Sequence, residues 1–395
     1  MLIGTFYSGI EVHRNEKIIV VKFLVPHRVI STCRANGGLR DDLGLIYNHQ
    51  SCEPTGHKRK SHAMAVHEPA VYLQQICRQN GLSENCASLG TAANMNCAAV
   101  ESERFRDLEI VAVCTGGVET NAGRAGDPAS VYEENGKFTP VASAICQNGN
   151  KRCAVEKAKE DSGTINTILC ISKELTSGAM VRSVMMATEA KTAALQELNV
   201  NSCYSNGLAT GTGTDQIAVA CVLTGKSPLT SASKHSKLGE LIGLTVKKAV
   251  AGTLKLQNGM SPQSRCSVLV HLERFGADTL SMKEGMGRFL SKETTELLEN
   301  NFNCIDRDPV TVATAAALVH LRDKLAWRIL PETCLPEIFS TYGAHLAAAV
   351  SGKYDRFGFY KDRLDGYKFR LDNSALLEFI CFCMSIGFEE KWKNI

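Results

Sequence analysis

The chain has 395 residues, of which 44% are hydrophobic and 22% charged, an ordinary composition for a globular protein with a sizeable core. A net charge of +3 over this length is too small to indicate nucleic-acid binding, and the 10 prolines give no sign of extensive disorder. The 16 cysteines are scattered without paired CxxC motifs, which argues against a disulfide framework or a zinc site and favours reduced thiols.

The N-terminal segment alternates between polar and apolar residues. It carries charged residues before its first good apolar run, unlike a cleavable signal, and no later stretch reaches about 18 uncharged apolar residues. We therefore expect a soluble, cytoplasmic protein without a membrane span. Residues 5–32 predict several short strands with tight turns, as in an antiparallel meander.

The next polar cluster follows a short apolar run at residues 45–47. Asn48 and His49 come directly after this run, where a rigid strand can hold functional side chains in a loop. The plainer interpretation of His49 is an exposed loop residue. Residues 63–82 have the apolar spacing of a helix, and residues 88–100 suggest another strand.

A glycine-rich loop follows the buried-strand pattern of residues 109–116. Its glycines would let the backbone approach a ligand, and Arg124 and Asp127 supply opposite charges. The loop fits neither a P-loop nor a dinucleotide-binding fingerprint, and a surface Arg–Asp pair is the structural alternative. Residues 135–162 are polar and charged, which suggests an excursion or a flexible loop.

A strand with an internal polar residue precedes the longest helix pattern. Residues 163–171 predict this strand, in which Asn166 must find hydrogen-bond partners or face a ligand. Residues 176–198 predict a helix that Thr176 can cap. Glu189 and Lys191 lie in its middle, two residues apart, so they do not face each other and are most simply solvated.

The stretch from Ser205 to Leu244 combines small residues, hydroxyls and one carboxylate. Its glycine–threonine run includes Thr212, Gly213 and Thr214 and ends at Asp215. A strand at 216–223 and a helix at 237–256 would hold this run still, with His235 in the loop between them. We interpret the run as the floor of an active site.

The chain after residue 258 has a different character. Residues 260–395 are mostly helical in pattern, with long apolar runs at 310–330 and 375–384. We predict an α/β or α+β fold: a mixed β-sheet covered by helices over residues 1–258, and a mostly helical C-terminal extension over 259–395. The strands near 18–25, 109–115, 163–171 and 216–223 would be central.

Six segments in order resemble one known family. They are YNHQ, CTGGVETNAGRAGDP, GTINTILCI, ATEAKTAALQEL, ATGTGTDQIAVAC and KLGELIGLTV. Together they are similar to the adenosylcobinamide amidohydrolases, over roughly residues 20–255 and most strongly over 163–250. Residues 31–40 are less regular than the family's usual small-residue stretch, and residues 135–162 are longer and more charged.

The resemblance implies a role in corrinoid salvage. The implied reaction cleaves the amide that joins the aminopropanol arm to the corrin ring of adenosylcobinamide, giving adenosylcobyric acid and 1-aminopropan-2-ol. The cobalt belongs to the corrinoid substrate, so no protein cofactor or metal is implied. We expect no nucleic-acid or membrane partner, and assembly into a homo-oligomer stays open.

Amide hydrolysis needs a nucleophile, an acid or base, and donors for the developing oxyanion. Asp215 is the leading base candidate, and the structural alternative for aspartate at this position is a helix or turn cap. Thr214 could be a nucleophile or a donor, and His49, with His235 as its competitor, could protonate the amine. For substrate binding the candidates are Asn48, Arg124, Asp127, Asn166, Glu189, Lys191, Thr212 and Gly213.

Two other functions fit the same residues. A corrinoid-binding protein without hydrolytic activity would use the same glycine loops and amide-matching side chains. An unrelated transferase or phosphate-binding enzyme would instead use the loop from Gly116 to Asp127.

Overall fold

The computed structural model describes residues 1–51, 60–141 and 163–393. The chain divides into two compact units. The first unit comprises Met1–Asp127, Glu156–Cys203 and Gly207–Ser261, and the second comprises Pro128–Val155, Tyr204–Asn206 and Pro262–Ile395. Each unit is described by itself.

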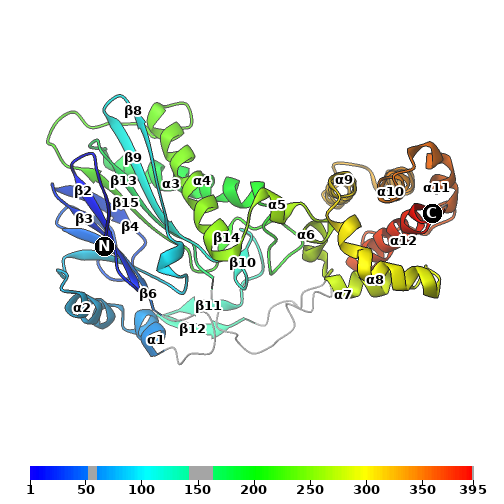
Figure 1. Ribbon diagram of the computed structural model, residues 1–395. Coiled ribbons are helices and arrows are strands. Elements are labelled where there is room, and N and C mark those ends of the chain that lie inside the picture. The colour runs from blue at the N-terminus through cyan, green and yellow to red at the C-terminus, as the bar shows by residue number, and fades with distance from the viewer. Residues whose placement is uncertain (52–59, 142–162, 394–395) are drawn as a thin grey trace. The chain divides into compact units, whose positions relative to one another are not determined.

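The first unit contains two large β-sheets (Figure 1). The first sheet has five strands in the order β1-β2-β3-β6-β7, antiparallel except for the parallel pair β6 and β7. Its strands are β1 (Leu2–Phe6), β2 (Ile10–Arg14), β3 (Ile18–Phe23), β6 (Leu45–Gln50) and β7 (Cys86–Thr91). Of the meander predicted over residues 5–32, β2 and β3 form an antiparallel pair of this sheet, whereas the strand that follows them along the chain, β4 (His27–Ser31), belongs to the second sheet.

The second sheet has six strands in the order β5-β4-β15-β13-β9-β8. β13 and β15 run parallel, and the other neighbouring pairs are antiparallel. Its strands are β4 (His27–Ser31), β5 (Gly38–Arg40), β8 (Ala99–Phe105), β9 (Leu108–Thr115), β13 (Asn166–Ile171) and β15 (Gln216–Val222).

The central strands of the second sheet are buried on both faces, which explains their continuous apolar sequence. In β9, Val111 and Val113 join a core with Ile19 and Ile46 of the first sheet. Because side chains alternate along a strand, Ile110 and its same-face neighbours point the other way, into a core shared with two long helices. The two sheets therefore pack face to face within this unit.

Helices cover the outer face of each sheet. α2 (Pro69–Asn80) packs against the first sheet through Tyr72, Leu73 and Ile76. α3 (Ser177–Glu197) and α4 (Lys237–Asn258) pack against the second sheet. The predicted cap of α3 is confirmed, since the Thr176 hydroxyl accepts the Ala179 amide at 3.2 Å.

The second unit is mostly helical in its described part. One core cluster joins its helices and contains only residues between 268 and 388. The second unit also includes the hairpin of β11 (Val131–Glu134) and β12 (Lys137–Pro140). The helices are α5 (Pro262–Arg265), α6 (Val268–Leu272), α7 (Thr279–Gly287), α8 (Lys292–Asp306), α9 (Pro309–Ala326), α10 (Leu335–Ser351), α11 (Phe357–Arg363) and α12 (Asn373–Lys391). Among the residues described, no helix is both long and apolar enough to cross a membrane.

The predicted α/β or α+β class with a helical C-terminal part is confirmed, with strands in two large sheets rather than one. The helix expected over 63–82 is two helices, α1 (Lys60–His67) and α2, because Pro69 has no amide hydrogen to continue the first and starts the second. The strand expected over 88–100 ends at Thr91, and a short 3-10 turn separates it from β8. Of the excursion expected over 135–162, residues 142–162 lie outside the described part.

Candidate active site

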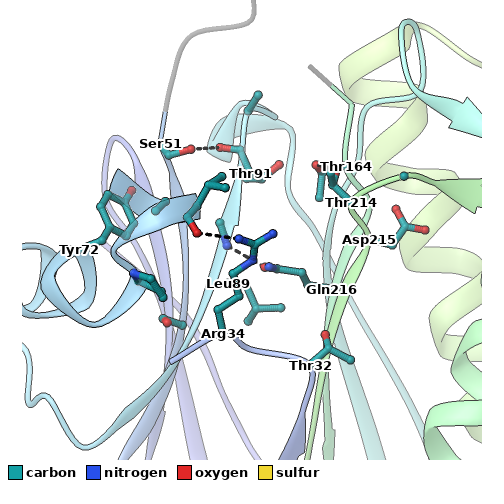
Figure 2. A pocket seen from close by; sticks show the side chains of 17 residues that line it. Thr32, Arg34, Ser51, Tyr72, Leu89, Thr91, Thr164, Thr214, Asp215 and Gln216 are labelled. Atoms are coloured by element: carbon teal, nitrogen blue, oxygen red, sulfur yellow. Dashed lines mark hydrogen bonds between the residues drawn. The ribbon is translucent and has the colours of Figure 1, made fainter. Parts of the chain in front are cut away.

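A cavity of about 290 Å³ opens between the two sheets of the first unit (Figure 2). It lies where β6 and β7 end and where β13 and β15 begin, so segments far apart in the sequence form its walls. Hydroxyl groups dominate its polar lining. They belong to Thr32, Ser51, Tyr72, Ser88, Thr91, Thr164 and Thr214.

A network of buried amides links the two sheets beside the cavity. Asn166 is 1% exposed, and its Nδ2 donates to Asn48 Oδ1 at 3.0 Å and to the Gly90 carbonyl at 2.9 Å. Asn48 Nδ2 donates to the Thr115 hydroxyl, and the Gly90 amide donates to Gln216 Oε1. Asn48 and Asn166 do not line the cavity, so they position its walls and satisfy each other's buried polar groups.

A pair of threonine hydroxyls forms one wall. Thr164 Oγ1 and Thr214 Oγ1 lie 2.6 Å apart, and Thr214 donates to the Gly163 carbonyl at 2.9 Å. Thr164 is buried, whereas Thr214 is exposed toward the cavity (Figure 2). Among the described residues, none of the hydrogen bonds of Thr214 runs to a carboxylate or an imidazole.

The Asp215 carboxylate has a full set of partners. Its Oδ1 accepts the Thr212 hydroxyl at 2.6 Å and the Ile165 amide at 2.9 Å. Its Oδ2 accepts the Thr212 amide at 3.0 Å and pairs with the Lys191 ammonium of α3. Both partners of this ion pair are largely buried, with side chains 14% and 15% exposed.

Asp215, which directly precedes β15, and Gln216, its first residue, point to opposite sides of the second sheet. Gln216 reaches Gly90 of the first sheet, whereas the Asp215 carboxylate reaches Lys191 on the helix-covered side (Figure 2). Asp215 thus lines the cavity, but its carboxylate holds the turn that carries Thr212 and Thr214. This geometry gives it the function of a turn cap, which the sequence left as an alternative to a base.

Two glycines permit this packing. A Cβ atom on Gly211 would lie 2.5 Å from Asp215 Oδ2 and 2.9 Å from Lys191 Nζ. A Cβ atom on Gly213 would lie 3.0 Å from Asn121 Oδ1. Gly211 and Thr212 form β14, which pairs with β10 (Ala122–Gly123) and so joins the glycine–threonine run to the glycine-rich loop.

Tyr72 stands between His49 and the cavity. Its hydroxyl lies 2.6 Å from His49 Nδ1, and Tyr72 lines the cavity whereas His49 does not. Burial, with a smaller contribution from the Lys17 charge, lowers the pKa of His49 to about 4. The imidazole is therefore neutral near pH 7, and the role of His49 as the acid stays a prediction.

Arg34 is the cation that lines the cavity. Figure 2 shows its guanidinium between the two walls, where Nη1 donates to the Val66 carbonyl at 2.7 Å. Asp215 is the other charged residue of the lining, and Lys191 neutralises it. Because Asp215 is paired with Lys191, which does not itself line the cavity, Arg34 is the charged lining residue without an oppositely charged partner among the described residues.

Other candidates from the sequence lie away from the cavity. The side-chain pair of Arg124 and Asp127, the structural alternative for this loop, is replaced by local bonds. Asp127 Oδ2 accepts the Arg124 amide and the Ser202 hydroxyl, and the Arg124 guanidinium donates to the Leu208 carbonyl. Glu189 pairs with Lys234 on the surface. Neither Arg124, Asp127, Glu189 nor the exposed His235 lines the cavity.

The sequence missed Arg34, Tyr72 and Thr164. Arg34 stands in a stretch without a strand or helix pattern, and Tyr72 sits on a helix whose apolar stripe explained its neighbours. Thr164 follows a glycine and lies just before β13, and Thr214 likewise follows a glycine and lies just before β15. That parallel placement of two hydroxyls was the available signal, because β13 and β15 run side by side in the same direction.

Comparison with known proteins gives two matches. A protein-family model described as adenosylcobinamide amidohydrolase matches residues 4–262. An uncharacterized protein of Methanocaldococcus jannaschii, MJ1613, is 34% identical over 253 residues, which cover 61% of this chain and 87% of that protein.

Proposed function

This chain belongs to the adenosylcobinamide amidohydrolase family, and we propose from that premise that it cleaves the aminopropanol amide of adenosylcobinamide. The products would be adenosylcobyric acid and 1-aminopropan-2-ol. The observation that carries the proposal beyond the family match is a cavity lined by paired threonine hydroxyls and one arginine. Its volume of about 290 Å³ is at the lower end of ligand pockets, which suits a side arm rather than a whole corrin ring.

Thr214 is the proposed nucleophile. Its exposed hydroxyl lies on the cavity and contacts the Thr164 hydroxyl, which can relay a proton. The Thr214 oxygen would bond to the amide carbonyl carbon, its proton would pass to the nitrogen, and the carbon–nitrogen bond would break to release the amine. Water would then hydrolyse the ester, which restores the hydroxyl and leaves a carboxylate.

Asp215 and Lys191 would support this step by fixing the turn. Asp215 accepts two hydrogen bonds from Thr212, the residue before Gly213. The Gly213 amide donates to the Asn121 carbonyl at 3.3 Å and the Thr214 amide to the Thr212 hydroxyl at 3.5 Å, so each would have to exchange this long bond for one to the developing oxyanion. Asn48 and Asn166 would keep the two walls in register.

Tyr72 and His49 are proposed to act on the leaving group, which is the amine of aminopropanol. The aminopropanol product has an amine and a hydroxyl, and the Tyr72 hydroxyl can donate to either when His49 Nδ1 carries its proton and donates to Tyr72. A neutral His49 imidazole would orient that hydroxyl rather than protonate the amine itself. The cobalt ion would arrive with the substrate, in the corrin ring.

The test is product analysis by mass spectrometry. Adenosylcobinamide incubated with the protein should give adenosylcobyric acid and 1-aminopropan-2-ol in equal amounts, and the T214V variant should give neither. Binding of adenosylcobinamide without release of aminopropanol would contradict the proposal and would identify a corrinoid-binding protein. The transferase alternative has less support, because Arg124 and Asp127 of the glycine-rich loop are bonded within their own surroundings.

A further inference from the structure

Arg34 differs from two arginines that lie close to it in the chain. Arg28 forms two 2.7 Å hydrogen bonds with Asp41, and Arg40 forms bonds of 2.7 and 2.6 Å with Asp42. Arg34 donates once, to the Val66 carbonyl, and has no carboxylate partner among the described residues. As far as the chain is described, its remaining N–H groups have no hydrogen-bond partner, and they can serve a ligand in the cavity that Arg34 lines (Figure 2).

The charges around the cavity favour a negatively charged group beside Arg34. Lys191 neutralises Asp215 on the far side of the strand, and His49 behind Tyr72 is uncharged near pH 7. A guanidinium binds a carboxylate through two parallel hydrogen bonds, a geometry that a neutral amide with one carbonyl oxygen cannot match. The cavity is therefore suited to a carboxylate at this position.

We propose that Arg34 binds the carboxylate formed on the corrinoid side arm, and that it holds the carbonyl oxygen of the same arm before cleavage. This inference rests on the proposed hydrolysis, which converts that carbonyl oxygen into one of the two carboxylate oxygens. Arg34 then contacts the reacting group both before and after cleavage of the amide. The ligand class is a corrinoid with one free propionate arm among amidated ones.

The experiment compares two ligands that differ in one group. Adenosylcobyric acid carries the carboxylate, and its primary amide replaces that carboxylate with a neutral group of the same shape. Calorimetry at pH 7 should show that the wild-type protein binds the acid about 10-fold or more tightly than the amide, as expected for a hydrogen-bonded ion pair. In R34Q the two ligands should bind about equally.

Arg40 supplies the matched control. R40Q also removes an arginine from this segment, but Arg40 is paired with Asp42 and does not line the cavity, so this variant should keep the wild-type preference. R34K keeps the charge without the planar fork and should show a reduced preference. If R34Q does not fold, R34K decides the matter, because an unchanged preference in R34K would contradict the assignment.

The outcomes separate this inference from the proposed function. Release of aminopropanol by a wild-type protein without any preference for the acid would overturn the role of Arg34 and leave the hydrolase intact. A wild-type preference that persists in R34Q would also overturn it. If R34Q loses the preference for the acid and the wild-type protein releases no aminopropanol, the carboxylate site is supported and the proposed hydrolysis is contradicted.

Discussion

At the residue scale, Asp215 couples a buried ion pair to the turn that carries the threonines. Breaking a buried pair by removing one partner costs more than removing both, because the remaining charge has no compensation. Since Asp215 also accepts from Thr212, its substitution should affect both the stability of the fold and the position of Thr214. These two effects can be separated by removing Lys191 as well.

We expect D215N to lower the free energy of unfolding by about 3 kcal/mol and to reduce turnover to background. The double variant D215N/K191M should recover much of the stability, because the uncompensated ammonium is gone, but not the turnover. Thermal unfolding and aminopropanol release measure the two quantities. Full turnover in either variant would show that the reaction does not require the Asp215 carboxylate.

Thr214 tests whether a hydroxyl is needed at the cavity wall. T214V keeps the shape of the side chain and removes the oxygen, so we expect loss of turnover with little change in the melting temperature. T214S should retain part of the activity. The control is T188V on α3, where an exposed hydroxyl donates to the Val184 carbonyl of the same helix at 2.9 Å. Wild-type turnover by T214V would exclude Thr214 as the nucleophile.

At the element scale, β14 brings the glycine–threonine run against α3. The strand is only two residues long, and the contact works because Gly211 has no side chain. G211A should force Asp215 and Lys191 apart, at a cost of about 2 kcal/mol, and reduce turnover with it. Chemical denaturation and product release would measure these changes.

Gly178 provides the control for that substitution. It lies in the first turn of α3, and an added Cβ atom would meet no neighbour within 4 Å. Because alanine favours the helix more than glycine does, G178A should leave turnover unchanged and stabilise the protein by up to about 1 kcal/mol. Equal effects of the two variants would show that β14 is not a constrained contact.

The elements that could be predicted from the sequence are those with a strong local pattern. The apolar runs of β9, β13 and β15 and the stripe and cap of α3 indicated each element within a few residues. The division of the strands into two sheets could not be predicted, because a strand buried by a helix and a strand buried by a second sheet have the same apolar sequence. Pro69 was a local signal for the helix break that the apolar spacing concealed.

The candidate site was predicted only in part for the same reason. Gly213, Thr214 and Asp215 line the cavity as the glycine–threonine run suggested, and Asn48 and Asn166 meet through the packing of the two sheets. Arg34 and Tyr72 approach the same space from segments without a distinguishing motif. Their roles depend on long-range packing, which spacing along one chain does not encode.

At the scale of the whole molecule, one buried and two partly buried histidines should make stability depend on pH. Burial lowers the pKa of His27, and burial together with nearby positive charges lowers those of His49 and His271 to about 4. Between about pH 6.5 and 4 the unfolded chain then binds more protons than the folded one. The contribution of these histidines to the free energy of unfolding is therefore fully present above about pH 6.5, and it decreases as the pH falls toward 4.

H49Q should therefore flatten the pH dependence of the melting temperature between about pH 6.5 and 4. The expected difference at the acid end is at most about 3 kcal/mol, at 1.36 kcal/mol per pKa unit. H235Q is the control, because the His235 side chain is exposed. A slope identical to that of the wild-type protein would show that His49 does not contribute.

The separate cores of the two units predict what truncation should do. The core of the second, helical unit contains only residues between 268 and 388. The three cores of the first unit, which holds the two large sheets, contain none of these residues. The family match also ends at residue 262, beside the division between Ser261 and Pro262. Every residue lining the cavity precedes that point.

We therefore expect residues 1–261 to fold and to release aminopropanol from adenosylcobinamide. The segment Tyr204–Asn206 should become more mobile, because Asn206 loses its paired hydrogen bonds with Asn373 and the contact of its carbonyl with Arg274. Its amide hydrogens should exchange faster with solvent, while those of β13 and β15 should stay protected. A folded but inactive fragment would show that the helical unit takes part in the reaction, and an unfolded fragment would show that the sheet-containing unit requires it for stability.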